Sequence, residues 1–157
     1  MKTRMLFLSA LVILLSTIPL GVIAQDKYVP KANEELYGTW TNEQNNGDIY
    51  HPQKVVVTSD GYTGYSRIFD SVPLFTWKSW IDSKWTDSEG NIWYRVFGKG
   101  VGVWEGHRSQ ELYKLSKSAT VMERAFNGWQ GDEFDPSKYP TKIDLSEAPY
   151  RILFRAE

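Results

Sequence analysis

The chain carries few of the side chains that enzymes commonly use for proton transfer or metal binding. It has no cysteine, and its two histidines are His51 and His107. No H-x-H or H-E-x-x-H spacing brings two such ligands together, which is the usual support of a zinc site. Both histidines stand beside turn residues and are expected to be solvated. The sequence therefore predicts no metal site and no cofactor.

Serine and carboxylate chemistry has little more support. The G-x-S-x-G motif that positions a nucleophilic serine is missing. Asp132, Glu133 and Asp135 lie close together, and a carboxylate pair can hydrolyse a glycoside when one member acts as acid and the other as base or nucleophile. A solvated acidic loop explains the same residues, because in a chain with 19 acidic residues some pair always falls close together. We expect no catalytic residue and no enzymatic activity.

Aromatic residues are the strongest chemical feature of the chain, with seven tryptophans, nine tyrosines and seven phenylalanines. They either fill a solid core, as close-packed interiors require, or line a cavity for a flat or amphipathic molecule. Trp93 and Trp104 are open to both interpretations. In residues 75–86 apolar and polar side chains alternate, which is typical of a strand with one buried face. This alternation predicts an inward row of ligand-contacting residues, namely Phe75, Trp77, Ile81 and Trp85. Tyr65 and Arg95 are expected to supply polar contacts to the ligand.

A second use of the aromatic residues is also open. Trp80 breaks the alternation and falls on the polar face, where it is either a surface residue or the sign of a register shift. If Trp80, Trp129 and Tyr139 are exposed, their rings would form a platform for stacking against sugars. The alternative function is therefore a carbohydrate-binding module with an exposed aromatic platform.

Strands and tight turns must position these side chains. Clusters of Asn, Asp, Gly and Ser, which suit hairpin turns, recur at residues 45–48, 59–61, 87–91, 105–107 and 116–118. They separate eight predicted strands, near residues 37–44, 49–59, 61–70, 75–86, 92–104, 110–117, 119–127 and 150–156. Eight strands joined mainly by short turns predict an all-β, up-and-down antiparallel barrel, because closure removes the exposed sheet edges. A β-sandwich of the same strands is the alternative.

The size of such a barrel and its one long loop bear on function. An interior bounded by eight strands can hold one small ligand. Loops as long as residues 128–149 are uncommon in compact domains and are often lids or covers. The sequence therefore predicts that this loop covers the mouth of the barrel.

The first 24 residues indicate where the protein is delivered. Lys2 and Arg4 precede an uncharged run over residues 5–24 that ends in small residues, the pattern of a cleaved secretory signal peptide. An uncleaved membrane anchor is the alternative, although Pro19 and Gly21 interrupt the run. We expect a polar leader over residues 25–33, a barrel domain over residues 34–157, and a secreted or periplasmic protein that carries no lipidation cysteine and does not span the membrane after cleavage.

The charge of the chain argues against two classes of partner. Its 18 basic and 19 acidic residues are dispersed and give a formal net charge of −1, whereas nucleic-acid binding calls for a concentrated basic face. A lipid-facing strand would not accept Arg151 and Arg155 without a large cost. The expected partner is a small hydrophobic or amphipathic molecule.

The run "LYGTWTNE" adds a family resemblance. Its Gly38 and Trp40 stand on the first predicted strand after a polar leader, which resembles the G-x-W signature that opens the lipocalin-like (calycin) barrels. The resemblance implies that the glycine lets the chain turn into the first strand and that the indole plugs the closed end of the barrel. It also implies an arginine from the last strand packed over that indole, for which Arg155 is the candidate and Arg151 or Arg124 a substitute. Gly38, Trp40 and Arg155 are thus expected to be structural, in a protein that binds its ligand without catalysis.

Overall fold

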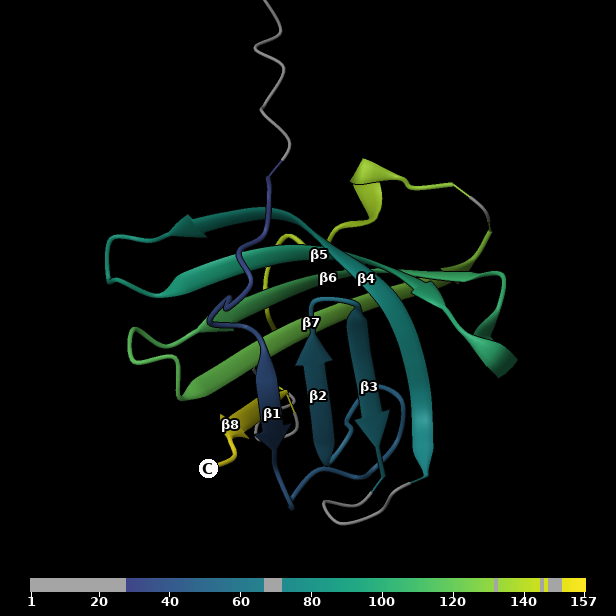
Figure 1. Ribbon diagram of the computed structural model, residues 1–157, viewed down its shortest axis with the longest axis horizontal. Coiled ribbons are helices and arrows are strands. Elements are labelled where there is room, and N and C mark those ends of the chain that lie inside the picture. The colour runs from purple at the N-terminus through teal and green to yellow at the C-terminus, as the bar shows by residue number, and fades with distance from the viewer. Residues whose placement is uncertain (1–27, 67–71, 132, 145, 147–150) are drawn as a thin grey trace, which may run out of the picture.

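Short turns join eight antiparallel strands into a sheet that closes on itself in the computed structural model (Figure 1). Residues 28–66, 72–131, 133–144, 146 and 151–157 are described, so the predicted signal peptide, residues 1–24, lies outside the described residues. The strands are β1 (Gly38–Thr41), β2 (Lys54–Thr58), β3 (Gly61–Tyr65), β4 (Pro73–Thr86), β5 (Ile92–Gly100), β6 (His107–Leu115), β7 (Val121–Gln130) and β8 (Ile152–Arg155). Each strand pairs with the next, and β8 pairs with β1. The predicted all-β, up-and-down barrel is confirmed, and the sandwich alternative is wrong.

Helical structure is limited to two short 3₁₀ turns, η1 (Gly102–Trp104) and η2 (Pro136–Lys138), among the residues that the structure describes. No helix in this part of the chain is long and apolar enough to span a bilayer. The four long strands, β4 to β7, form one side of the barrel, and the shorter strands complete it (Figure 1).

The β4–β5 turn shows how the turn residues fix the hairpins. Asp87 Oδ1 accepts hydrogen bonds from the backbone N–H groups of Glu89 (3.0 Å) and Asn91 (2.9 Å). Gly90 adopts φ +87°, a conformation that favours glycine. The turn therefore fixes the start of β5 relative to the end of β4.

A β-bulge changes which side chains of β4 face the interior. Ile81 lies opposite Val96 and Ser83 lies opposite Arg95, so Asp82 is an extra residue on β4. Before the bulge Phe75, Trp77 and Ile81 are buried, as expected from the alternation. After it the alternation changes faces, and Trp85 is 39% exposed on the outer surface. The predicted inward row is therefore wrong at Trp85.

Trp40 and Arg155 close one end of the barrel. The Trp40 indole is fully buried, and its N–H donates to the Leu36 carbonyl oxygen at 3.0 Å. The Arg155 guanidinium carbon lies 4.4 Å from the centre of the Trp40 ring, within the range of a cation–π contact. Arg155 also donates to the carbonyls of Ala119 (2.9 Å) and Tyr37 (3.0 Å). The contact expected between Arg155 and Trp40 is confirmed.

Gly38 makes this contact possible. Its φ is +142°, and a Cβ atom built on it would lie 2.7 Å from Arg155 Nη1. A side chain at this position would displace the guanidinium group from the Trp40 ring. Gly38 therefore acts through close approach as well as through its backbone conformation.

The residues expected as a leader contribute to the same end of the barrel. The Glu34 carboxylate is buried and accepts hydrogen bonds from the Tyr28 hydroxyl and from the Lys31 backbone N–H (2.8 Å). Lys84, which the bulge turns inward, places its Nζ 2.8 Å from Glu34 Oε2. Residues 28–37 thus form part of the closed end.

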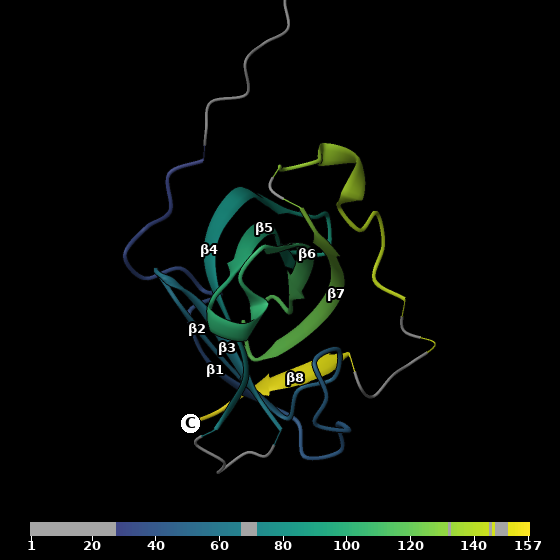
Figure 2. The ribbon, with the colours of Figure 1, turned by 90° about the vertical axis from the view of Figure 1, so that its right-hand side faces the viewer.

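The long loop after β7 packs against the outside of the barrel. Figure 2 shows it passing outside β6 and β7. Tyr139 of this loop is buried, with the Arg95 guanidinium carbon 5.4 Å from its ring centre, and Asn127 of β7 donates to the Lys138 carbonyl at 2.7 Å. The prediction that this loop covers the mouth is wrong for the described residues, because its aromatic residues cover the outer wall instead.

Candidate functional site

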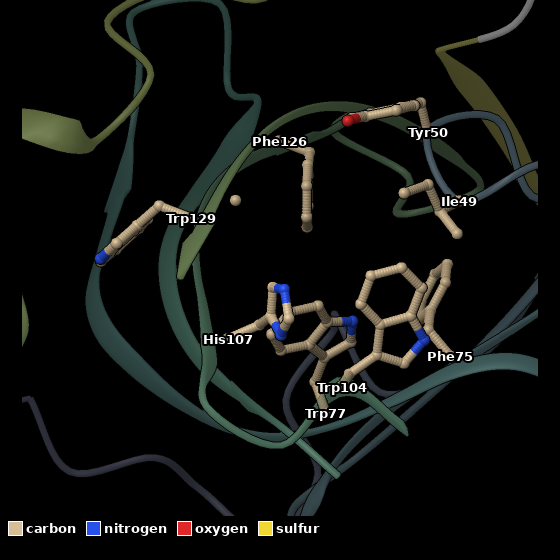
Figure 3. A pocket seen from close by; sticks show the side chains of 9 residues that line it. Ile49, Tyr50, Phe75, Trp77, Trp104, His107, Phe126 and Trp129 are labelled. Atoms are coloured by element: carbon tan, nitrogen blue, oxygen red, sulfur yellow. The ribbon is translucent and has the colours of Figure 1, made fainter. Parts of the chain in front are cut away.

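An aromatic cavity of about 230 Å³ lies at the end of the barrel that faces the viewer in Figure 2. Its lining comes from the loop before β2, from β4, from η1, from β6 and from β7. Figure 3 shows most of these side chains around the open space, with the Trp129 ring directed away from it, and the lining residues are Ile49, Tyr50, Phe75, Trp77, Trp104, His107, Phe126, Gly128 and Trp129. Most of this lining is aromatic, so the cavity suits an apolar or flat molecule.

The β5–β6 connection places Trp104 in the mouth. A Cβ atom on Gly100 would lie only 2.0 Å from the Trp104 carbonyl oxygen, so the close return of the chain through η1 requires glycine there. The Trp104 indole N–H donates to the Leu74 carbonyl at 3.1 Å. This hydrogen bond ties the connection to β4 and fixes the ring as a wall of the cavity.

The aromatic walls contact one another around Trp77. The Trp77 ring is stacked with Trp104 at a centroid distance of 6.4 Å and meets Phe126 edge-on at 6.1 Å. Trp104 in turn meets the His107 ring edge-on at 5.5 Å. These rings support one another, so the shape of the cavity is set before a ligand enters.

His107 introduces a polar atom into the aromatic lining. Its Nδ1 atom is buried and has no hydrogen-bond partner among the described residues. A buried polar atom without a partner costs free energy that a ligand can recover by hydrogen bonding to it. The expectation that His107 is a solvated turn residue is wrong, because it begins β6 and lies beside the cavity.

A buried polar network forms the layer beneath the cavity. Glu111 accepts hydrogen bonds from the hydroxyls of Tyr62 and Tyr113, and Arg124 Nη2 donates to its Oε2 at 3.1 Å. Burial raises the pKa of Glu111, although Arg124 acts in the opposite direction. The Tyr62 ring stacks on Trp77 at 6.4 Å, which joins this network to the cavity wall.

The network leaves donors unused. The Nε and Nη1 atoms of Arg124 are buried and have no hydrogen-bond partner in the described part of the chain. Beyond this layer the barrel is filled by core side chains, among them Trp40, Val55, Leu115, Met122 and Leu153. The interior is thus packed at the closed end and open at the mouth.

The structure brings together only part of the predicted site. Phe75 and Trp77 line the cavity, whereas Ile81 belongs to the core beyond it. Tyr65, Trp85 and Arg95 lie on the outer surface, where Lys54 Nζ is 4.1 Å from the Tyr65 ring centre and the Arg95 guanidinium carbon is 5.6 Å from that of Trp85. The expectation that Tyr65 and Arg95 supply polar groups inside the barrel is therefore wrong.

The proposed three-residue sugar platform is not assembled either. Trp129 borders the mouth with its ring turned toward Lys138 of the outer loop, Tyr139 is buried in that loop, and Trp80 is 47% exposed on the outer face of β4. The described residues contain no group of three or more His, Cys, Asp or Glu side chains that could hold a metal ion.

The sequence did not predict most of the residues that line the mouth of the barrel. Ile49 and Tyr50 fell in a predicted strand, His107 in a predicted turn, and Trp129 in the loop. Trp104 alone of the additional lining residues stood among the candidates for a cavity wall. Comparison with known proteins adds no further candidates, because no protein-family model, curated protein or solved structure matches the chain.

Proposed function

We propose that this protein is an exported, lipocalin-like carrier that binds one small amphipathic molecule in the mouth of its barrel, without catalysis. The observation that carries the proposal is the aromatic cavity with the unpartnered His107 Nδ1 atom beside it. Aromatic walls favour an apolar body, and one polar atom fixes its orientation. The resemblance of Gly38 and Trp40 to the calycin signature supports the same function.

The volume of the cavity limits the size of the ligand. A cavity of about 150 Å³ can hold a benzene ring, and pockets for drug-sized molecules measure about 300–1,000 Å³. The present cavity, about 230 Å³, lies between these sizes. The ligand is therefore a molecule of one or two rings, or a short chain, that carries a polar group.

Titration with 2-naphthol, followed by the seven tryptophan indole N–H signals in NMR spectra, tests the proposal directly. We expect shifts at Trp77 and Trp104, whose rings line the cavity. Trp104→Ala should weaken binding by about 10- to 100-fold, the effect of losing about 1.5–3 kcal/mol of aromatic burial. Trp85→Ala is the matched control and should bind as the unaltered protein does, because Trp85 lies outside the barrel.

The polar contact is tested with 2-methylnaphthalene, which has the same rings and no hydroxyl. The unaltered protein should prefer 2-naphthol by about 2- to 10-fold, the value of one hydrogen bond of about 0.5–1.5 kcal/mol. His107→Phe should remove that preference. Shifts confined to Trp80, Trp85 and Trp93 would place binding on the outer surface and would contradict the proposal.

A further inference from the structure

Three cationic side chains lie side by side on the outer face of the barrel. Lys78 on β4 pairs with Lys99 on β5, and Lys99 pairs with Arg108 on β6. Like charges directly opposite each other in a sheet destabilise it. Both lysines are exposed, whereas Arg108 is buried and its Nη1 donates to the His107 carbonyl at 3.0 Å, and the three residues line one hollow whose acidic member is Glu105. We call Lys78, Lys99 and Arg108 the cationic row.

An aromatic hollow of about 300 Å³ adjoins the cationic row. Trp80 is stacked with Phe97 at a centroid distance of 5.6 Å, and Phe134 of the outer loop meets Phe97 edge-on at 5.1 Å. Lys99 belongs to both hollows, and its Nζ lies 5.5 Å from the Trp80 ring centre. The two features therefore form one continuous surface.

The outer loop and the β-bulge build this surface. The loop supplies Phe134 as a side wall, and the bulge places Asp82 beside Trp80 in the lining of the aromatic hollow. Trp80 is 47% exposed and Phe134 is 42% exposed, so together they form an exposed aromatic patch of the kind that marks binding surfaces. An exposed indole flanked by a carboxylate and an ammonium group offers a ring face, hydrogen-bond acceptors and hydrogen-bond donors within one hollow.

We propose that this surface binds an acidic oligosaccharide. The apolar face of one sugar ring stacks on Trp80, its hydroxyls donate to Asp82, and its carboxylate or sulfate groups lie against the exposed Lys78 and Lys99 of the cationic row. Neighbouring strands lie about 5 Å apart, and residues two positions apart on one strand lie about 7 Å apart. The stacking ring, the carboxylate and the ammonium groups are therefore close enough together to contact one short oligosaccharide. Binding of an anion also relieves the repulsion between Lys78 and Lys99. This site is separate from the mouth of the barrel.

Asp82 distinguishes this ligand from single-stranded nucleic acid, which also uses aromatic stacking and basic grooves. A carboxylate beside the stacking ring accepts hydrogen bonds from the free hydroxyls of a sugar ring, which the sugars within a single-stranded DNA chain do not offer.

Calorimetric titration of the exported protein with tetragalacturonic acid and with cellotetraose, which have equal numbers of rings, tests the proposal. We expect the acidic oligosaccharide to bind more tightly than the neutral one and to lose affinity as salt is added. Trp80→Ala should weaken the binding of tetragalacturonic acid about tenfold or more. Trp93→Ala removes another aromatic residue from the outer face of β5 and is the matched control, which should bind as the unaltered protein does.

The double variant Lys78→Gln, Lys99→Gln tests the charge contribution. It should weaken the binding of the acidic ligand by about 3- to 5-fold, as expected for exposed ion pairs. The affinity for the neutral ligand should stay unchanged. Its melting temperature should equal or exceed that of the unaltered protein, because the like charges are gone. The proposal would be overturned if neither oligosaccharide bound, or if the double variant bound tetragalacturonic acid as tightly as the unaltered protein does. It would also be overturned if an oligothymidylate bound in place of the oligosaccharides.

Discussion

Trp40 shows how one residue can hold the closed end of the barrel. It is fully buried, hydrogen-bonded to Leu36 and covered by Arg155. We expect Trp40→Ala to lower the free energy of unfolding by about 3–5 kcal/mol, because a large aromatic side chain is lost from a packed site. Urea unfolding measures the change, and Trp80→Ala, at an exposed position, should cost less than about 1 kcal/mol. A loss below about 1 kcal/mol for Trp40→Ala would contradict the role of Trp40 as a plug.

Single residues differ in how well the sequence predicts them. Gly38 and Trp40 could be assigned because they match a short motif, and the resemblance to the calycin barrels implies an arginine of the last strand over that tryptophan, for which Arg155 is the candidate. His107 could not be assigned, because a histidine next to a glycine suits a solvated turn as well as the start of a strand. Only the pairing of His107 with Gln130 on β7 places its ring beside the cavity.

The same limit appears in whole strands. The alternation of β4 predicts the facing of Phe75, Trp77 and Ile81, because these residues precede the bulge. One extra residue, Asp82, then turns Lys84 inward and Trp85 outward. A bulge has no dependable sequence signal, and a single inserted residue changes the face of every side chain after it. The outer position of Trp85 follows from that one insertion, whereas Arg95 faces outward because its neighbours on β5, Tyr94 and Val96, are buried.

Residues 28–37, which form part of the closed end of the barrel, make the stability of the folded state depend on pH. Lys84 Nζ lies 2.5 Å from Glu35 Oε2, and this hydrogen bond together with that of Tyr94 lowers the pKa of Glu35 from its usual value of 4.5 to about 2. Hydrogen bonds from Lys31, Lys84 and Tyr28 lower the pKa of Glu34 against the effect of its burial. A lowered carboxyl pKa stabilises the folded state above the unfolded pKa, and this stabilisation is lost as the pH falls through the folded pKa.

We therefore expect Lys84→Met to destabilise the protein by about 1.5–3 kcal/mol at neutral pH, the value of hydrogen bonds to a charged group. The difference from the unaltered protein should shrink between about pH 4.5 and about pH 2, where Glu34 and Glu35 become protonated. Denaturant unfolding over this pH range measures it. Lys114→Met is the control, because the ion pair of Lys114 with Glu123 is longer, at 3.7 Å. A difference that stays constant with pH would show that Lys84 acts through packing alone.

At the scale of the molecule, the order of the strands could be predicted and the distribution of space inside the barrel could not. Short turns leave each strand beside the next, so the topology follows from the turn residues. Whether the interior is filled depends on how side chains from different strands meet. The network around Glu111 and Arg124 separates a packed closed end from an open mouth, and none of its contacts joins residues that are neighbours in a turn. The outer loop illustrates the same point, because its length suggested a cover, whereas Phe134 and Tyr139 bind it to the outer wall.

The pairing of β1 with β8 closes the sheet, and the strength of this seam can be measured. Between β5 and β6 the register runs without a break from Ile92↔Leu115 to Lys99↔Arg108, whereas β1 and β8 pair through Trp40↔Arg155 and Thr41↔Phe154 within the described residues. Local opening is easiest where few backbone hydrogen bonds must break together. The seam between β1 and β8 is thus expected to open before the long strands do.

Amide hydrogen exchange tests this order. The Ala156 N–H group donates to the Thr39 carbonyl of β1 at 2.9 Å and is expected to open at a cost of only about 1–3 kcal/mol. The amides of Tyr94 and Tyr113 should exchange only through global unfolding, at about 5–15 kcal/mol. Equal protection at both places would mean that the packing of Arg155 over Trp40 holds the seam as firmly as a long ladder does. The side-chain contact, rather than the length of strand pairing, would then set the cooperativity of the barrel.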